Sequence, residues 1–460
     1  MPDTIVALAT PTGRSGIGVI RISGDAATAI TGRMTGDDKF SPKPRFATLQ
    51  KLYYPSTNEV IDEAIVTYFP GPRSFTGEDV IEISCHGSPV LLRQVIDICL
   101  SLDARMAEPG EFTLRALSNG RIDLAEAEAI RDLIDAQTAA SARQAARQMS
   151  GEMSRQLTPL KNEILSVIVV LESALEFVED DLPATQLESV RTSLIDIARE
   201  IERLAGTYRA GHLIREGLCV AIVGRPNVGK SSLFNSMFGG DRAIVTDIAG
   251  TTRDQIHERM VISNIPISLI DTAGLRETSD TVESIGVERS RALMADADLV
   301  IVILDASEPI TKEDHKILDS VRKFDFIVAL NKIDKVPSWD IDRVIAGEHS
   351  SLGYLRPRIT PVSAKSGEGI DALRDAIIKP FAPEDISNAG FLVSDARHHD
   401  LLLRTKSEIE DSVERLDERL SEEIVLIGLH NALRYLGDIT GETTTEDMLD
   451  QIFATFCIGK

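Results

Sequence analysis

The feature that most constrains the fold of this chain is the segment Gly224–Ser231, which reads GRPNVGKS. It matches the pattern GxxxxGK[ST], and it stands directly after the apolar run VAIV and before the helix-like run SSLFNSMF. In such a strand–loop–helix unit the glycines let backbone N–H groups point at phosphate oxygens, and the helix N-terminus adds a partial positive charge. We expect Lys230 to contact the outer phosphates and the Ser231 hydroxyl to ligate Mg²⁺. The sequence therefore predicts a P-loop nucleotide-binding domain.

Four further segments follow in the order that a guanine-nucleotide site requires. Asp271–Gly274 (DTAG) ends an apolar run, where an aspartate can hold the Mg²⁺ shell and a glycine N–H can sense the γ-phosphate. Asn331–Asp334 (NKID) ends another, and its last carboxylate can accept two hydrogen bonds from guanine that adenine cannot offer. Ser363–Lys365 (SAK) stands where a backbone N–H would read the guanine carbonyl, and Gly250–Asp254 (GTTRD) stands where a switch threonine is expected. Together these segments predict a GTPase.

The residues expected to promote hydrolysis differ from those of Ras-like GTPases. Leu275 occupies the position at which Ras-like proteins carry the glutamine that orients water. Asn227 in the phosphate loop could ligate a monovalent cation beside the phosphates, or it could simply stabilise the loop. Glu283 could position water, or it could be a solvated residue in the first turn of a helix. The residues alone leave both alternatives open.

Three kinds of sequence follow one another along the chain and predict a multidomain fold. Residues 1–119 mix short β-branched runs with Gly- and Pro-containing turns, which indicates an α+β domain. Residues 120–215 have helical spacing of apolar side chains, residues 216–380 alternate strands and helices in an α/β domain, and residues 381–460 return to helical spacing. The economical interpretation is a discontinuous helical domain into which the Ras-like GTPase domain is inserted. The apolar positions expected to form helix faces are Leu124, Ile130, Leu133, Ile134, Leu160, Ile164, Val167, Ile168, Leu171, Leu175, Val190, Leu194, Ile197, Ile201, Leu204, Leu402, Ile409, Val413, Leu416 and Leu420.

Composition limits the classes of partner. The formal net charge is −23, so nucleic acid is not expected to be bound through the whole surface, and any RNA contact needs a local patch or a basic partner. The four cysteines form no CxxC pair. No signal peptide and no membrane span is visible, which together with the cysteine pattern predicts a cytoplasmic protein without a membrane partner.

With these motifs in place, the whole chain resembles the MnmE family of tRNA modification GTPases, also called TrmE. The resemblance rests on TIVALATPTGRSGIGVIRISG and FTGEDVIEISCHG near the N-terminus, NGRIDLAEAEAI, GRPNVGKSSLFN, IAGTTRD, DTAGLRE and the terminal FCIGK. The related GTPases Era and Der lack the N-terminal segments and the terminal cysteine motif.

For the GTPase domain, the resemblance implies activation by potassium in place of an arginine finger. Potassium would be held by Asn227 and by backbone oxygens of Thr246, Ile248 and Thr251, whereas Ser231 and Thr252 would hold magnesium. Glu283 would be the catalytic acid, acting through a bridging water after two GTPase domains dimerise. The GTP-binding residues expected from motifs and resemblance together are Asn227, Val228, Gly229, Lys230, Ser231, Ser232, Thr246, Asp247, Ile248, Ala249, Gly250, Thr251, Thr252, Asp271, Thr272, Ala273, Gly274, Asn331, Lys332, Asp334, Ser363, Ala364 and Lys365.

For the two ends of the chain, the resemblance implies an N-terminal domain that binds a one-carbon derivative of tetrahydrofolate (5-formyl or 5,10-methylene) and forms a permanent homodimer. The aligned folate-site residues are Arg21, Glu82, Arg121 and Lys460. Many relatives carry lysine where this chain has Arg121, and the charge is kept. Cys457 in the terminal motif could be a nucleophile or redox group, or a small buried apolar side chain. The other three cysteines are expected to be structural.

The activity implied by the resemblance is a tRNA modification. With the partner MnmG, which uses FAD and NADH, the chain would add an aminomethyl or carboxymethylaminomethyl group to carbon-5 of the wobble uridine of certain tRNAs; DNA is not an expected partner. Two alternatives stay open: an Era-like regulatory GTPase in ribosome assembly, and a GTP-binding scaffold without turnover. The first would need an RNA-binding appendage such as a KH domain, and the residues after Lys379 show no GXXG with basic flanks.

Overall fold

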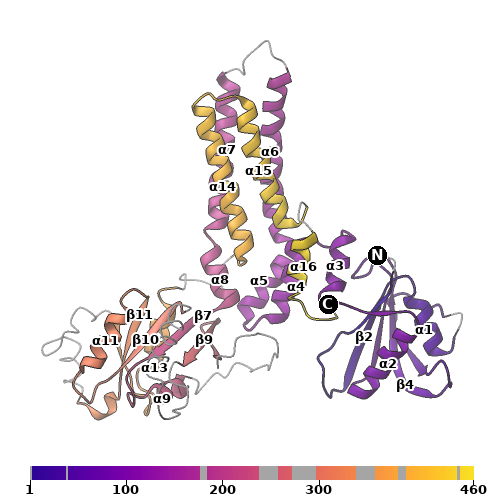
Figure 1. The fold of residues 1–460 in the computed structure, drawn as a ribbon, viewed down its shortest axis with the longest axis horizontal. Coiled ribbons are helices and arrows are strands. Elements are labelled where there is room, and N and C mark those ends of the chain that lie inside the picture. The colour runs from indigo at the N-terminus through magenta and orange to yellow at the C-terminus, as the bar shows by residue number, and fades with distance from the viewer. Residues whose placement is uncertain are drawn as a thin grey trace. The chain divides into compact units, whose positions relative to one another are not determined.

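The computed structural model describes residues 3–37, 40–176, 184–237, 257–271, 297–337, 358–381, 390–442 and 446–459. The chain divides into two compact units. Figure 1 labels helices and strands of both units. The first contains Met1–Ile134, Ala146–Arg199 and Arg404–Lys460, and the second contains Asp135–Ala145 and Glu200–Leu403. Each unit contains one six-stranded sheet together with helices.

The sheet of the first unit has the strand order β3-β4-β5-β2-β1-β6, and every pairing except the parallel β1–β6 pair is antiparallel. Side chains alternate along β2 and β5, so that Ile20 and Ile83 are buried in the core with the side chains of the covering helices. The same alternation turns Arg21 and its cross-strand partner Glu82 to the opposite face. The elements are β1 Ile5–Leu8, β2 Ile17–Ser23, α1 Ala27–Thr35, β3 Thr48–Tyr53, β4 Val60–Phe69, β5 Val80–His86, α2 Pro89–Ser101 and β6 Arg105–Met106.

Long helices bury most of the apolar faces expected from the sequence. The buried positions include Leu160, Ile164, Val167, Ile168 and Leu171 on α6, Val190, Leu194 and Ile197 on α7, and Ile409 and Leu416 on α14. Among the described residues, none of the helices is both long and apolar enough to span a bilayer. The helices are α3 Glu111–Ser118, α4 Leu124–Asp135, α5 Ala139–Met149, α6 Glu152–Glu176, α7 Ala184–Ala205, α8 Tyr208–Glu216, α14 Ala396–Asp417, α15 Glu422–Thr440 and α16 Glu446–Phe453.

Helix α4 differs from the expectation. Of the four residues predicted to form its buried face, Leu124 is fully buried, but Ile130 and Leu133 are only half-buried and Ile134 is 43% exposed. The helix packs closely against its neighbour: a Cβ atom added at Gly441, just after α15, would lie 2.8 Å from Leu124 Cβ. Short side chains permit such an approach, and the buried face beyond Leu124 consists of Ala125, Ala127, Glu128 and Ala129.

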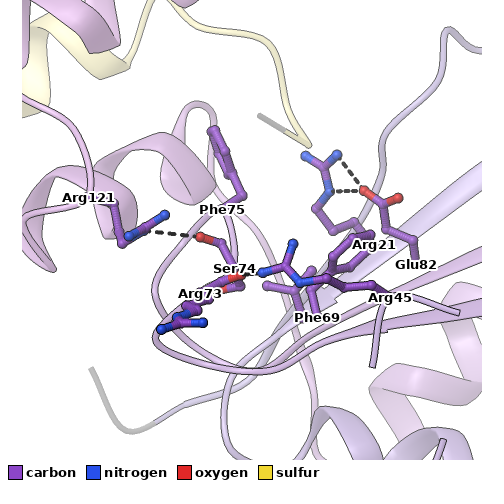
Figure 2. Close-up of a pocket in the computed structure, with 9 residues that line it drawn as sticks. Arg21, Arg45, Phe69, Arg73, Ser74, Phe75, Glu82 and Arg121 are labelled. Atoms are coloured by element: carbon purple, nitrogen blue, oxygen red, sulfur yellow. Dashed lines mark hydrogen bonds and ion pairs between the residues drawn. The ribbon is translucent and has the colours of Figure 1, made fainter. Parts of the chain in front are cut away.

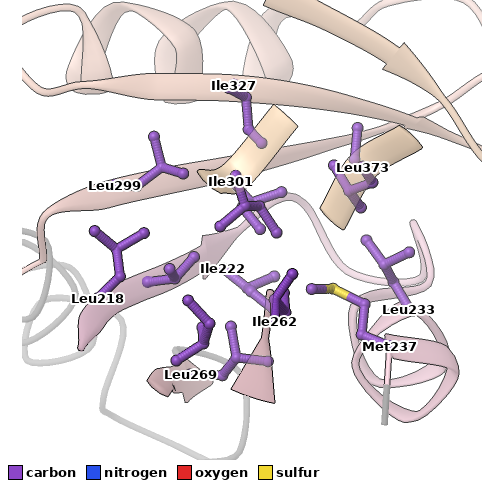
Figure 3. Close-up of a cluster of buried hydrophobic side chains, with 14 of the residues drawn as sticks. Leu218, Ile222, Leu233, Met237, Ile262, Leu269, Leu299, Ile301, Ile327 and Leu373 are labelled. Carbon is purple, nitrogen blue, oxygen red and sulfur yellow. The ribbon is translucent and has the colours of Figure 1, made fainter. Parts of the chain in front are cut away.

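The sheet of the second unit is parallel except for the β8–β9 hairpin, with the order β12-β11-β10-β7-β9-β8. All residues of β10 and β11 are buried, because apolar clusters cover both faces of the sheet; Figure 3 shows one of them around Ile222 and Ile301. The alternation of strands and helices that the sequence predicts for this part of the chain is confirmed. The elements are β7 Leu218–Val223, α9 Lys230–Met237, β8 His257–Ile262, β9 Ile265–Asp271, β10 Leu299–Asp305, α11 Lys312–Val321, β11 Phe326–Asn331, the 3₁₀ turn η1 Ile333–Lys335, β12 Ile359–Pro361 and α13 Ile370–Ile378.

The predicted domain boundaries near residues 119, 215 and 380 stay predictions. The division into two compact units passes through α7, between Arg199 and Glu200, and through α14, between Leu403 and Arg404. It also passes through α5, between Ala145 and Ala146, and leaves the last residue of α4 in the second unit, so it does not coincide with the ends of the predicted helical domain.

A buried arginine in α3 holds the loop before β5 in place. Arg115 is 2% exposed, and its guanidinium lies 2.8 Å from Asp3, 2.9 Å from Glu111 and 3.1 Å from Glu78. Glu78 also accepts a hydrogen bond from Ser23 of β2. Burial alone would raise the pKa of Glu111, but hydrogen bonds from Arg105 and the Glu108 N–H, together with Arg115, lower it below its ordinary value. This carboxylate therefore stabilises the fold above its ordinary pKa, and the contribution is lost as the pH falls through the lowered pKa.

We expect Arg115→Met to destabilise this region by about 3 kcal/mol, because removal of one partner leaves buried carboxylates uncompensated. Hydrogen exchange of the β5 and α3 amides at neutral pH measures the loss. Arg93→Met on α2, where the arginine is 79% exposed, is the matched control and should change protection by less than about 0.5 kcal/mol. Equal protection in the two variants would contradict the role given to Arg115.

Candidate functional site: a nucleotide site and an N-terminal pocket

The phosphate loop joins β7 to α9 at the point where the strand order reverses. In the sheet, β9 lies on one side of β7, whereas β10, the next strand along the chain, lies on the other side. Sheets of parallel strands bind ligands at such a reversal of strand order. Gly224 and Gly229 permit close approach: a Cβ at Gly224 would lie 2.7 Å from Ile303 O, and one at Gly229 would lie 2.4 Å from Asn331 Nδ2. Gly229 also has φ +98°. The loop therefore has the backbone that the sequence motif requires.

The two functional side chains of the phosphate loop have different surroundings. Lys230 Nζ donates to Gly224 O at 2.8 Å and to Arg225 O at 3.0 Å, so the lysine lies over the loop in which the phosphates are expected. Asn227 is exposed, and its φ of 66° places it in the left-handed region, which asparagine tolerates better than most residues. Ser231 and Ser232 are exposed in the first turn of α9.

Asn331 connects three segments of the nucleotide site. Its side chain is 1% exposed, and Nδ2 donates to Val228 O in the phosphate loop at 2.9 Å. Its Oδ1 accepts from the Ala364 N–H at 3.0 Å. Both polar ends of the buried amide are thus satisfied, and the phosphate loop and the SAK segment are held to the end of β11.

Asp334 lies beside the SAK segment. Its Oδ1 accepts a hydrogen bond from Ser363 Oγ at 2.7 Å, and Ser363 Oγ in turn accepts from the Ser366 N–H at 3.1 Å. The hydrogen bond fixes one oxygen of the carboxylate, an arrangement that orients the group for a base. Lys365 follows in the same turn.

Asp305, at the end of β10, belongs to the site although the sequence analysis did not single it out. Lys332 Nζ lies 2.5 Å from Asp305 Oδ2 and donates to Asn227 O at 2.7 Å. Burial raises the pKa of Asp305, but the hydrogen bonds from Lys332 and Ser307 outweigh it and hold the pKa below its ordinary value. The signal available in the sequence was the aspartate that ends the apolar run LVIVILD.

The arginine within the phosphate loop is held on the side of α11. Arg225 lies 2.6 Å from Glu308 and 3.4 Å from Asp314, the residue that closes the capping box of α11 with Thr311. Its charge is therefore compensated by two carboxylates.

Several predicted site residues lie outside the described residues. They are Thr246, Asp247, Ile248, Ala249, Gly250, Thr251, Thr252, Thr272, Ala273, Gly274, Glu283 and Lys460. Asp271 is the last residue of β9, and only its backbone position is described.

A pocket of about 480 Å³ opens on the face of the N-terminal sheet that carries Arg21 and Glu82 (Figure 2). It brings together Arg21, Glu82 and Arg121, three of the four residues expected for a folate site. Arg21 donates to Glu82 Oε1 from Nε at 3.0 Å and from Nη2 at 2.7 Å, while Arg121 Nε donates to Ser74 O at 3.2 Å. The sequence analysis missed the other lining residues, which come from loops and strand ends: Arg45, Phe69, Arg73, Ser74, Phe75 and Val80.

The C-terminal segment reaches this pocket within the first unit. Arg21 Nη1 donates to Gly459 O at 3.2 Å, and the segment is anchored by the Pro109–Ile458 bridge and by the Gly110 N–H, which donates to Cys457 O. A Cβ at Gly459 would lie 2.4 Å from Leu8 O, so the close approach requires glycine.

The cysteines divide into two groups. Cys457 is exposed, which excludes the buried apolar alternative. Burial raises the pKa of the Cys85 and Cys99 thiols to about 12, as expected of structural thiols, and Cys219 is half-buried.

Comparison with known proteins gives the same order of segments along the chain. Residues 4–121 match the family model described as GTP-binding protein TrmE N-terminus, and residues 124–457 match that of the MnmE helical domain. The tRNA modification GTPase MnmE of Koribacter versatilis is 43% identical over 463 residues, and that of Aquifex aeolicus is 42% identical over 462, with 100% of both chains covered in each case. The chain belongs to the MnmE family.

Membership of the MnmE family confirms the predicted resemblance and the multidomain fold with an N-terminal TrmE-type domain, a helical domain and a P-loop GTPase domain. A solved structure of Era from Aquifex aeolicus bound to GDP and AlF4⁻ is 29% identical and covers 42% of this chain and 66% of its own. The TM-score of this structure is 0.29.

Asp334→Asn should change the base that the site accepts. The amide can no longer accept both hydrogen bonds from N1–H and the 2-amino group of guanine, so we expect GTP affinity to fall about 100-fold. Xanthosine triphosphate carries a carbonyl at that position and should bind the variant better than GTP does. Fluorescent nucleotide titration measures both, with Asp371→Asn, 94% exposed on α13, as the control. Unchanged preference for GTP would contradict the assignment of Asp334.

Proposed function

We propose that this chain is a cytoplasmic, potassium-activated GTPase that modifies tRNA. Together with the FAD- and NADH-dependent partner MnmG, it adds an aminomethyl or carboxymethylaminomethyl group to carbon-5 of the wobble uridine of certain tRNAs. GTP is hydrolysed to GDP and phosphate when two GTPase domains dimerise. The observation that carries the proposal is the set of contacts made by Asn331 in a member of the MnmE family that matches its relatives over their whole length.

The nucleotide-binding part of the proposal is supported by the division of roles among the described residues. The loop from Gly224 to Gly229 offers backbone N–H groups to the phosphates, and Lys230 lies within reach of that loop. Asp334 offers a carboxylate oriented by Ser363, and the backbone N–H groups of the SAK segment lie next to it. The site thus has separate groups for the triphosphate and for the base, and both are joined through Asn331.

The metal-binding part of the proposal is supported by the oxygen ligands that the phosphate loop offers. The backbone carbonyl of Asn227 accepts a hydrogen bond from Lys332, whereas the Asn227 side chain is exposed. The side-chain amide oxygen of Asn227 therefore suits a weakly hydrated cation such as K⁺. Potassium bound there supplies positive charge beside the phosphates, the role that an arginine finger has in other GTPases. Ser231 would hold Mg²⁺ with Thr252, and Thr246, Ile248 and Thr251 would complete the potassium site; Glu283 would align water.

The one-carbon part of the proposal places a tetrahydrofolate derivative, 5-formyl or 5,10-methylene, in the N-terminal pocket. Both hydrogen bonds from Arg21 go to Oε1 of Glu82, which leaves Oε2 for the amidine-like edge of a pterin. Arg121 and Lys460 supply positive charge, and the exposed Cys457 is a candidate nucleophile or redox group. The homodimer is formed by the N-terminal domain.

The tRNA and the partner enter the proposal through charge. The chain carries 72 acidic and 49 basic residues, so a more basic partner would supply most of the contacts with tRNA. MnmG is the partner that the family implies.

GTP turnover should depend on potassium. We expect kcat to be at least about tenfold higher in KCl than in NaCl at equal ionic strength, since a cation at Asn227 stabilises the charge that develops during hydrolysis. Asn227→Ala should lose this stimulation yet keep GTP binding, while Asn235→Ala, on the exposed side of α9, should keep both. Equal rates in the two salts would refute potassium activation.

Loss of the gene should leave the wobble uridines unmodified at carbon-5. Mass spectrometry of nucleosides from bulk tRNA measures this, and a plasmid carrying the intact chain should restore the modification. A plasmid carrying Asp334→Asn should not, because the GTP site is impaired. Normal tRNA modification in the deletion strain, together with GTP-dependent association with ribosomes, would favour the Era-like alternative.

A further inference from the structure

The N-terminal pocket carries more positive charge than the predicted folate-site residues account for. Four of its lining residues are arginines and one is acidic. Arg21 is paired with that acid, Glu82. In the described part of the chain Arg45, Arg73 and Arg121 have no carboxylate partner: Arg45 and Arg121 donate to backbone carbonyls, of Arg73 and Ser74 respectively. Three guanidinium charges of the pocket are therefore not compensated by any carboxylate among the described residues.

The loop that carries Arg45 is held in an uncommon conformation. Arg45 has φ 57°, the left-handed region that costs a residue with a Cβ roughly 1 kcal/mol. The conformation is fixed by its own N–H, which donates to Tyr68 O of β4 at 2.7 Å, and by the Phe69 ring 6.0 Å from its guanidinium. This backbone conformation lets the Arg45 side chain line the pocket, although the loop that carries it lies just before β3, at the edge of the sheet.

The charges are separated across the pocket. Figure 2 shows the Arg21–Glu82 pair on one side and the Arg121 and Arg73 side chains on the other, with Arg45 between them. The first side offers a carboxylate oxygen to a ligand that donates hydrogen bonds, and the second offers guanidinium groups to a ligand that carries anions. A ligand with a neutral hydrogen-bonding head and a multiply anionic tail matches both sides.

We propose that Arg45 and Arg73 bind the carboxylates of a γ-linked oligoglutamate tail, so that the pocket selects polyglutamylated over monoglutamylated folate. The inference rests on the proposed function, because it names the form of the one-carbon carrier for the same pocket. A monoglutamate brings two carboxylates, which the N–H donors of Arg121 that are not used by Ser74 can meet. Each added glutamate brings one more anion, and Arg73, which is exposed at the rim, is placed to meet it.

Isothermal titration of the full-length chain with 5-formyltetrahydrofolate as the monoglutamate and as the pentaglutamate tests this inference. We expect the pentaglutamate to bind about five- to tenfold more tightly, since an exposed guanidinium–carboxylate pair contributes a factor of about two to five. The difference should shrink as NaCl is raised. Arg73→Gln and Arg45→Gln should each bring the ratio of affinities toward one while the monoglutamate affinity changes less than twofold.

Arg93→Gln, an exposed arginine on α2 that does not line the pocket, is the matched control and should keep the wild-type ratio. Equal affinity of the wild type for the two forms would overturn the inference and leave the folate site standing. A ratio that neither Arg45→Gln nor Arg73→Gln alters would also overturn it. A chain that binds neither form would overturn the folate part of the proposed function and this inference with it.

Discussion

The nucleotide site depends on one buried amide. Asn331 donates to the carbonyl of Val228 and accepts from the N–H of Ala364, so three loops that are more than thirty residues apart in sequence share a single side chain. A buried amide that is satisfied at both ends tolerates little displacement, because an unpaired polar group in the interior costs about 1–3 kcal/mol. The contact therefore fixes the distance between the loop for the phosphates and the segment for the base. Lys332 adds a second connection on the exposed side, from the loop carbonyl of Asn227 to Asp305.

Much of the GTPase domain could be predicted because its motifs are local. The glycines, lysine and serine of the phosphate loop are consecutive, and the apolar runs before each motif are buried on both sides of a parallel sheet, which gives them an unambiguous pattern. Asp305 was missed for a physical reason: a carboxylate at the end of one strand gains its role only from Lys332, which follows the end of the neighbouring strand, and such a pairing has no local signature.

The N-terminal pocket and α4 show where local patterns fail. Arg45, Arg73 and Arg121 come from loops that are far apart in sequence and meet only because the sheet folds, so neither composition nor spacing marks them as neighbours. In α4 the pattern of large apolar residues predicted the buried face only in part: Leu124 is buried, but Ile134 is exposed. Close helix packing selected the alanines for burial and left Ile134 exposed. Long helices such as α6 and α7, whose stripes continue over several turns, were predicted correctly.

The hydrogen bond from Arg21 to the carbonyl of Gly459 joins residues 438 positions apart. During synthesis the ribosome releases the β2 and β5 strands early, and their sheet can form while the GTPase domain is still being translated. The carbonyl of Gly459, which accepts from an arginine of the pocket, is added only when nearly all of these residues have been made. A nascent chain therefore has the sheet and the pocket arginine without this hydrogen bond, and proteolytic trimming of the last few residues would remove the restraint on Arg21 while leaving the sheet in place.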